Sequence, residues 1–198
     1  ITPRAMLAAT LATLATACAV GCTLIAFGGW WLLPAGIAIA LGALAYSAGP
    51  YPLSRHCLGE VAVIVFFGIA PVCLTYYIQV GTVTASVVAG SIAIGLLGAM
   101  VLITNNYRDI DEDRITGKHT LATRFGRKAM ARLYFVCGIV AATLLHPLSV
   151  AKIIPLALGF AGYNMLRRDN LTSQRCIKLL AITSLATLAT ALLIPLKI

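Results

Sequence analysis

Seven apolar segments, each close to the length that crosses a bilayer, constrain this chain more than any other feature. A bilayer-spanning helix needs about 20 consecutive, mostly apolar residues. The segments are Ala5–Phe27, Trp30–Ala48, Val61–Val80, Val83–Thr104, Ala129–Leu145, Val150–Leu166 and Cys176–Ile194. Only 11% of all residues are charged, whereas a soluble domain carries roughly 25%. Because backbone groups in lipid must pair within their own segment, each segment is expected to be a helix. The sequence therefore predicts an all-α, polytopic membrane bundle of seven helices, forming a single domain over residues 1–198.

The distribution of charge between the loops predicts which side of the membrane each loop occupies. Seven helices place alternate loops on opposite sides, and 13 of the 15 Lys and Arg residues fall on the side of Arg4, Arg55 and residues 105–128. All six acidic residues share that side, so its formal net charge is +7. Cytoplasmic loops carry an excess of Lys and Arg. We therefore expect this side to face the cytoplasm, at the inner (plasma) membrane of a cell. We expect the bilayer's anionic lipids, and no nucleic acid, to meet its basic surface.

The stretch NNYRDIDEDRITGKHTL, residues 105–121, concentrates the acidic side chains and follows an apolar segment directly. If the helix continues into it, Asp109 and Asp113 lie one turn apart on the same face, with Asn105 and Asn106 one turn earlier. Carboxylate and amide oxygens suit Mg²⁺, which takes one or two carboxylates together with water and substrate phosphates. We therefore predict a magnesium site formed by Asp109, Asp113 and Asn106.

A solvated, charged helix end is the alternative for these acids, and it is the simpler interpretation of Asp111 and Glu112. Acidic residues near a membrane are costly and usually functional. Cations that suit phosphate surround them: Arg108, Arg114, Lys118, Arg124, Arg127 and Lys128. We expect Arg108 and Lys118 to contact a diphosphate. Carboxylates, a hard metal, cations and an apolar interior together indicate a lipid diphosphate, with its head at the cytoplasmic face and its tail among the helices.

Two stretches carry a resemblance to a known family. NNYRDIDEDRITGKHTLATRFG, residues 105–126, resembles the second Asp-rich motif of the UbiA superfamily of intramembrane prenyltransferases. Its Asn-Asn-x-Arg-Asp start resembles the 1,4-dihydroxy-2-naphthoate polyprenyltransferase branch. So does YSAGPYPLSRHCLGEVAVIVFFG, residues 46–68.

The chain departs from that branch in three respects. Cys57 stands where the branch has a glycine before Leu-Gly-Glu, and Arg55-His56 stands where Tyr followed by a basic residue is common. Family members resemble a nine-helix bundle with an earlier Asn-x-x-x-Asp motif. This chain is expected to match the last seven helices and to lack the first two together with that motif. A missing N-terminal segment or a companion chain would then supply them.

The resemblance implies Mg²⁺-dependent transfer of a polyprenyl group from polyprenyl diphosphate to 1,4-dihydroxy-2-naphthoate. Carbon dioxide and diphosphate would leave, and the step would belong to menaquinone biosynthesis. The residues expected to act in catalysis are Asp109, Asp113, Arg108 and Lys118, and those expected to contact substrate are Asn105, Asn106, Tyr46 and Arg55. Tyr46 is equally interpretable as an interfacial aromatic residue. Glu60 fits a favourable place at a helix start or a catalytic role.

Three other functions are compatible with the same pattern. The chain could be a catalytically impaired, truncated relative that binds isoprenoid lipid or a quinone-pathway partner. It could also be a 4-hydroxybenzoate-type prenyltransferase or a transporter. A transporter places ionisable residues near the bilayer midplane, and the centres of these segments hold almost none. Transport is therefore the interpretation that the sequence favours least.

Overall fold

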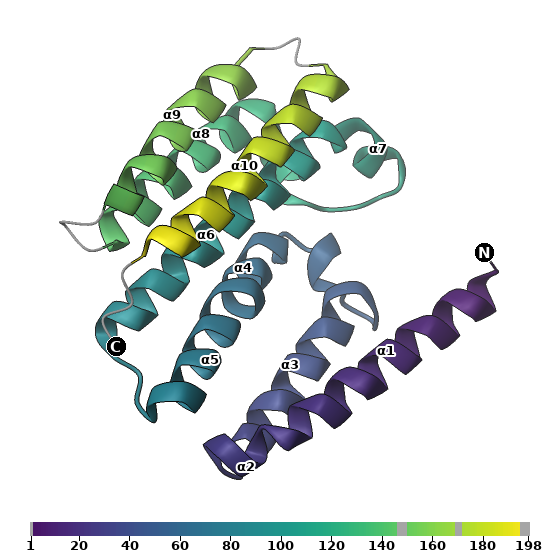
Figure 1. Cartoon of the computed structure of the whole chain (residues 1–198). Coiled ribbons are helices and arrows are strands. Elements are labelled where there is room, and N and C mark those ends of the chain that lie inside the picture. Colours follow the sequence, from purple (N-terminus) through teal and green to yellow (C-terminus); the bar gives the residue numbers. More distant parts are fainter. Residues whose placement is uncertain (1, 146–149, 169–171, 195–198) are drawn as a thin grey trace.

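The computed structural model describes residues 2–145, 150–168 and 172–194, and over these residues every regular element is helical (Figure 1). The α-helices are α1 (Pro3–Thr23), α2 (Ile25–Gly28), α3 (Leu32–Ser47), α4 (Gly59–Val63), α5 (Ala70–Val80), α6 (Ala85–Arg108), α7 (Ile110–Ile115), α8 (Leu121–Leu144), α9 (Ile153–Leu166) and α10 (Ser173–Leu193). Short 3₁₀ turns cover Leu53–Arg55 and Val150–Lys152, and a π-helical turn covers Ile64–Ile69. The predicted all-α class is confirmed.

The helices coincide with the predicted apolar segments. Four stretches in the described part of the chain are long and apolar enough to cross a membrane: Pro3–Gly28, Gly59–Val80, Ala85–Arg108 and Ser173–Leu193. Leu32–Ser47 and Val150–Leu166 are shorter apolar helices. The stretch Leu121–Leu144 of α8 is broken at Gly126, whose backbone is not helical (φ 79°, ψ 172°). A short turn precedes the break, capped by the Thr120 hydroxyl, which accepts a hydrogen bond from the Thr123 N–H at 3.2 Å. The apolar segment lies in the helix that follows the break. The chain is a multi-pass membrane helix bundle.

Helix α6 lies at the centre of the packed part of the bundle. It contacts α8, α10, α4 and the π-helical turn, and α8 packs along α9. Its side chains Leu97, Met100 and Ile103 are fully buried. Near its C-terminal end, the Tyr107 hydroxyl donates a hydrogen bond to the Leu166 carbonyl at 2.8 Å. By contrast, α1 has no buried residue and extends away from the bundle in Figure 1.

Two helix contacts depend on glycine. A Cβ on Gly68 would lie 2.5 Å from the Gly95 Cα atom, so the π-helical turn and α6 touch backbone to backbone. A Cβ on Gly138 would lie 2.8 Å from the Gly159 Cα atom, which closes α8 onto α9 in the same way. Small residues allow such close approach in membrane bundles. We attribute the widened turn before α5 to Pro71, which has no N–H and whose ring clashes with the preceding turn.

Candidate active site

The acidic stretch is almost one continuous helix. Helix α6 ends at Arg108, and Asp109 (φ −92°, ψ 9°) joins it to α7. The Asp109 N–H still donates to the Asn105 carbonyl at 3.0 Å, and the Asp113 N–H donates to the Asp109 carbonyl at 2.8 Å. The predicted spacing of one turn between Asn105, Asp109 and Asp113 is therefore present in the backbone.

Asp111 points into solvent. Its Oδ2 atom accepts a hydrogen bond from Arg127 Nη2 at 2.7 Å, and its Oδ1 atom lies 3.5 Å from Arg114 Nη1. The hydrogen bond from the Arg127 guanidinium lowers the pKa of the Asp111 carboxyl. This arrangement is the solvated helix end that the sequence indicated for Asp111.

Asp109 is bound by its own neighbour. Arg108 donates from Nε to Asp109 Oδ1 at 2.6 Å and from Nη2 to Asp109 Oδ2 at 2.8 Å. The same Nη2 donates to Asn105 Oδ1 at 2.7 Å. The side chains of Arg108 and Asp109 are each about one quarter exposed, so a phosphate group can reach Arg108 and a metal ion can reach Asp109. Any such ligand must share these groups with the existing ion pair.

Asp113 is buried, with 5% of its surface exposed, and among the described residues only one of its two carboxylate oxygens has a hydrogen-bond partner. Its Oδ1 atom accepts from Lys118 Nζ at 3.0 Å, whereas its Oδ2 atom has no hydrogen-bond partner among the described residues. An unpaired buried carboxylate oxygen is unfavourable unless a donor or a cation meets it. Over the same residues no group of three or more His, Cys, Asp or Glu side chains could hold a metal. Mg²⁺ needs only one or two carboxylates, and the Asp113 Oδ2 atom is an oxygen of the type that magnesium binds.

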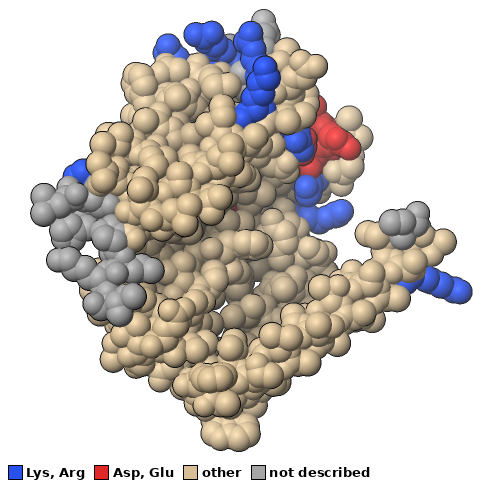
Figure 2. All heavy atoms as spheres, in the orientation of Figure 1, with Lys and Arg blue, Asp and Glu red and all other residues tan. Residues whose placement is uncertain are grey.

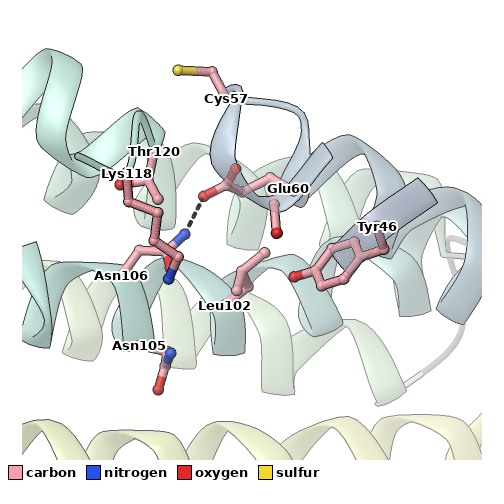
Figure 3. Close-up of a pocket in the computed structure, with 10 residues that line it drawn as sticks. Tyr46, Cys57, Glu60, Leu102, Asn105, Asn106, Lys118 and Thr120 are labelled. Carbon is pink, nitrogen blue, oxygen red and sulfur yellow. Dashed lines mark hydrogen bonds between the residues drawn. The ribbon is translucent and has the colours of Figure 1, made fainter. Parts of the chain in front are cut away.

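A cavity of about 220 Å³ lies between α4, α6 and the segment before α8 (Figure 3). Glu60 is 6% exposed at its wall, and its Oε1 atom accepts a hydrogen bond from Asn106 Nδ2 at 3.0 Å. The lining residues are Tyr46, Ser54, Cys57, Gly59, Glu60, Leu102, Asn105, Asn106, Lys118 and Thr120. We name this cavity the Glu60 pocket.

The structure brings together only part of the predicted site. Tyr46, Asn105, Asn106 and Lys118 line the Glu60 pocket. The residues outside its lining are Arg55, Arg108, Asp109 and Asp113. Glu60 also lines this pocket, and its role was left open between a favourable acid at a helix start and a catalytic residue. The sequence feature that could have identified Glu60 is a single carboxylate at the start of an apolar segment.

The two motifs meet through their backbones. Residues 55–57 and 119 pair as an isolated parallel bridge: the Cys57 N–H donates to the His119 carbonyl at 2.9 Å, and the His119 N–H donates to the Arg55 carbonyl at 3.1 Å. The Lys118 N–H donates to the Asp113 carbonyl at 2.8 Å. This pairing fixes Lys118 at the mouth of the Glu60 pocket. Arg55 contributes its carbonyl, while its side chain is exposed.

Cys57 has φ 58°, the single left-handed backbone among the described residues other than glycine. This conformation explains why a glycine is expected there. We predict that Cys57→Gly is tolerated, with unfolding free energy within about 1 kcal/mol of the unchanged chain, because glycine adopts this φ without strain. Cys57→Val is expected to lose about 2 kcal/mol, since a β-branched residue is disfavoured there. Thermal unfolding of both variants in detergent checks this, and equal stability of the two would contradict it.

A second, larger groove of about 490 Å³ opens beside the first. Among the described residues its lining includes no acid; it comprises Tyr51, His56, Cys57, Arg114, Gly117, Lys118, His119, Thr123 and Arg124. We name it the basic groove. Lys118 and Cys57 line both cavities. The site thus consists of two adjoining spaces of different charge, with a lysine between them.

The fold and this polar site define a multi-pass helical membrane protein with a cation-rich pocket at one end of its bundle. The model of the UbiA prenyltransferase family matches residues 1–193, and the chain belongs to that family. It is 35% identical to the 1,4-dihydroxy-2-naphthoate octaprenyltransferase of Mycobacterium tuberculosis, over 96% of this chain and 67% of that protein. The enzyme of the same name from Escherichia coli is 39% identical, over 64% of this chain and 39% of that protein. The Bacillus subtilis enzyme is 30% identical, over 82% and 57%.

The chain thus spans about two thirds of the Mycobacterium tuberculosis relative and less of the other two. No solved structure matches it.

Proposed function

We propose that the chain transfers a polyprenyl group from polyprenyl diphosphate to 1,4-dihydroxy-2-naphthoate, with loss of carbon dioxide and diphosphate, in menaquinone biosynthesis. The names of its relatives support this reaction. The observation that carries it is the meeting of two motifs, where Lys118 joins buried Asp113 to the Glu60 pocket. A carboxylate with a spare oxygen, cations and a small polar cavity at the end of an apolar bundle suit a lipid diphosphate and an aromatic acid.

The site is proposed to lie at the cytoplasmic face of the plasma membrane. Most Lys and Arg side chains visible in Figure 2 gather toward the end of the bundle where the acidic side chains, drawn in red, are also visible. That end carries the excess of basic residues expected of cytoplasmic loops. A diphosphate made in the cytoplasm would reach it directly, while the polyprenyl tail stays among apolar helices.

Mg²⁺ would be held by Asp113 and Asp109, with Asn106 as a supporting ligand. When bound, it supplies positive charge to the diphosphate as a Lewis acid. The spare Asp113 Oδ2 supports this assignment. Asn106 already donates from Nδ2 to Glu60, so its Oδ1 atom is the group that would serve a cation.

The residues of this chain stabilise charge on the leaving group. In the reaction, the allylic C–O bond breaks with its electron pair on diphosphate, and the ring carbon that carries the acceptor's carboxylate forms the new C–C bond. The acceptor's carboxyl group leaves as carbon dioxide and its electron pair returns to the ring. Lys118 and Arg108 would donate hydrogen bonds to the departing diphosphate, where negative charge grows in the transition state. Their fixed ion pairs with Asp113 and Asp109 hold them in place beforehand.

The reaction and its metal dependence are tested together on membranes that contain the chain. We expect prenylated, decarboxylated product from octaprenyl diphosphate and 1,4-dihydroxy-2-naphthoate with Mg²⁺, and at least about a hundredfold less with EDTA. Binding of a non-hydrolysable prenyl thiodiphosphate should also require Mg²⁺. Binding without turnover would favour a lipid-binding relative instead. Product formation at the same rate in EDTA would contradict the proposed metal site.

A further inference from the structure

The Glu60 pocket and the basic groove differ in the charges that line them. The Glu60 pocket contains one carboxylate, Glu60, and one ammonium, Lys118 (Figure 3). The basic groove contains Lys118 together with Arg114 and Arg124, and none of the described residues that line it is acidic. The two spaces therefore suit ligands of different chemistry.

A diphosphate fits the basic groove better than the Glu60 pocket. Like charges a few ångströms apart repel, most strongly where water is excluded. Glu60 is almost fully buried at the wall of its pocket, so a diphosphate placed there would face an unscreened carboxylate. The basic groove offers the cations and the larger volume of about 490 Å³.

A hydroxylated aromatic acid fits the Glu60 pocket. Its ring hydroxyl can donate a hydrogen bond to Glu60, and its carboxylate can accept one from Lys118. The volume of about 220 Å³ lies below the roughly 300–1,000 Å³ of pockets for drug-sized ligands. It therefore suits one or two fused rings and excludes a long polyprenyl chain.

Glu60 is held in place to accept such a hydrogen bond. It lies on α4, and Asn106 on α6 donates from Nδ2 to its Oε1 atom at 3.0 Å. The chain around it is anchored as well, because the Cys57 N–H is paired with the His119 carbonyl. A fixed, buried acceptor discriminates strongly, since a ligand without the matching hydroxyl leaves it unpaired.

Resting on the proposed function, we infer that the Glu60 pocket is the subsite for the aromatic acceptor and that Glu60 determines its specificity. Glu60 accepts a hydrogen bond from a ring hydroxyl of the acceptor. The diphosphate lies outside this pocket, on the basic-groove side of Lys118, where the Asp113 carboxylate that pairs with Lys118 can hold its Mg²⁺. Lys118, shared by both spaces, sits between the two substrates. The reacting carbons would then meet beside it.

The inference is tested by measuring binding of each substrate separately to purified protein. Equilibrium dialysis with 1,4-dihydroxy-2-naphthoate should show a Kd raised about tenfold to a hundredfold in Glu60→Gln, the effect of altering a hydrogen bond to a charged group. The Kd for prenyl thiodiphosphate with Mg²⁺ should change less than about twofold. The unchanged chain should bind 2-naphthoate, which lacks both hydroxyls, at least about tenfold more weakly than 1,4-dihydroxy-2-naphthoate. Glu60→Gln should reduce that preference.

Two further variants keep the test decisive. Leu102→Phe fills the same pocket without altering its charge, so it should weaken naphthoate binding even if Glu60→Gln does not fold. Glu112→Gln removes an exposed acid outside both cavities and should leave both Kd values unchanged. Unaltered naphthoate binding in both pocket variants, or a selective loss of thiodiphosphate binding, would overturn the inference.

Turnover separates this inference from the proposed function. If the unchanged chain forms product while Glu60→Gln and Leu102→Phe bind naphthoate normally, the acceptor subsite is wrong and the proposed reaction stands. If the chain binds naphthoate through Glu60 but forms no product, the proposed function fails and the subsite stands. If the unchanged chain binds no naphthoate, the subsite is overturned.

Discussion

Asp113→Asn is expected to lower prenyl transfer by about 10²–10³-fold, the effect of removing one preorganised charge-stabilising group. Asparagine keeps the size of the side chain but removes the negative charge that holds Lys118 Nζ at 3.0 Å. It also removes the spare carboxylate charge at Oδ2 that we assign to Mg²⁺. Mg²⁺-dependent binding of prenyl thiodiphosphate should weaken in parallel. Initial rates at saturating naphthoate measure the effect on turnover.

The matched control is Asp111→Asn, two positions away in α7. Asp111 is exposed and pairs with Arg127 and Arg114 at the surface. Exposed ion pairs contribute little to stability, so activity should stay within about twofold. Retention of more than a third of the activity in Asp113→Asn, or equal losses in both variants, would contradict the assignment of Asp113 as a Mg²⁺ ligand that positions Lys118.

Gly95→Ala is expected to reduce the free energy of unfolding by about 2–3 kcal/mol, the upper range for overpacking a well-packed interior. A Cβ at this position would lie 2.8 Å from the Ile64 carbonyl oxygen and 2.9 Å from the Ile64 Cα atom. Both are backbone atoms, so no side chain can rotate away. Unfolding in mixed detergent micelles, followed by circular dichroism, measures the loss. Helix α6 also carries Asn105 and Asn106 of the proposed site, so a displacement of this helix should lower prenyl transfer as well.

Gly90→Ala, on the same helix, is the matched control. A Cβ there would meet nothing within 4 Å. Alanine is favoured over glycine in helices by up to about 1 kcal/mol, so this variant should be as stable as the unchanged chain or slightly more so. If both alanine variants unfold alike, the backbone contact between α6 and the π-helical turn does not limit stability.

The sequence predicted the helices well because their signals are local. A run of about 20 apolar residues in lipid can satisfy its backbone only as a helix, and the seven segments are helical in the described chain. Pro71 and the capping Thr120 also act within a few residues of themselves. The apolar segment that begins at Ala129 lies in the part of α8 after the break at Gly126, whereas Thr120 caps the short turn before that break.

The site was predictable in its spacing but only partly in its contacts. The one-turn interval between Asp109 and Asp113 follows from helical periodicity and is present. Periodicity could not show that Arg108 donates hydrogen bonds to both oxygens of Asp109, while one Asp113 oxygen has no partner among the described residues. Rotamers and burial decide such differences, and they depend on neighbours from other helices.

The sequence by itself determined a helical membrane bundle with an acidic, cation-rich end, because hydrophobic length and helical period are properties of short stretches. Only the tertiary structure decided that Glu60 faces Asn106, 46 positions away, and that Cys57 pairs with His119, 62 positions away. Helix packing and loop closure create those contacts, and they place Lys118 between a carboxylate-lined pocket and a cationic groove.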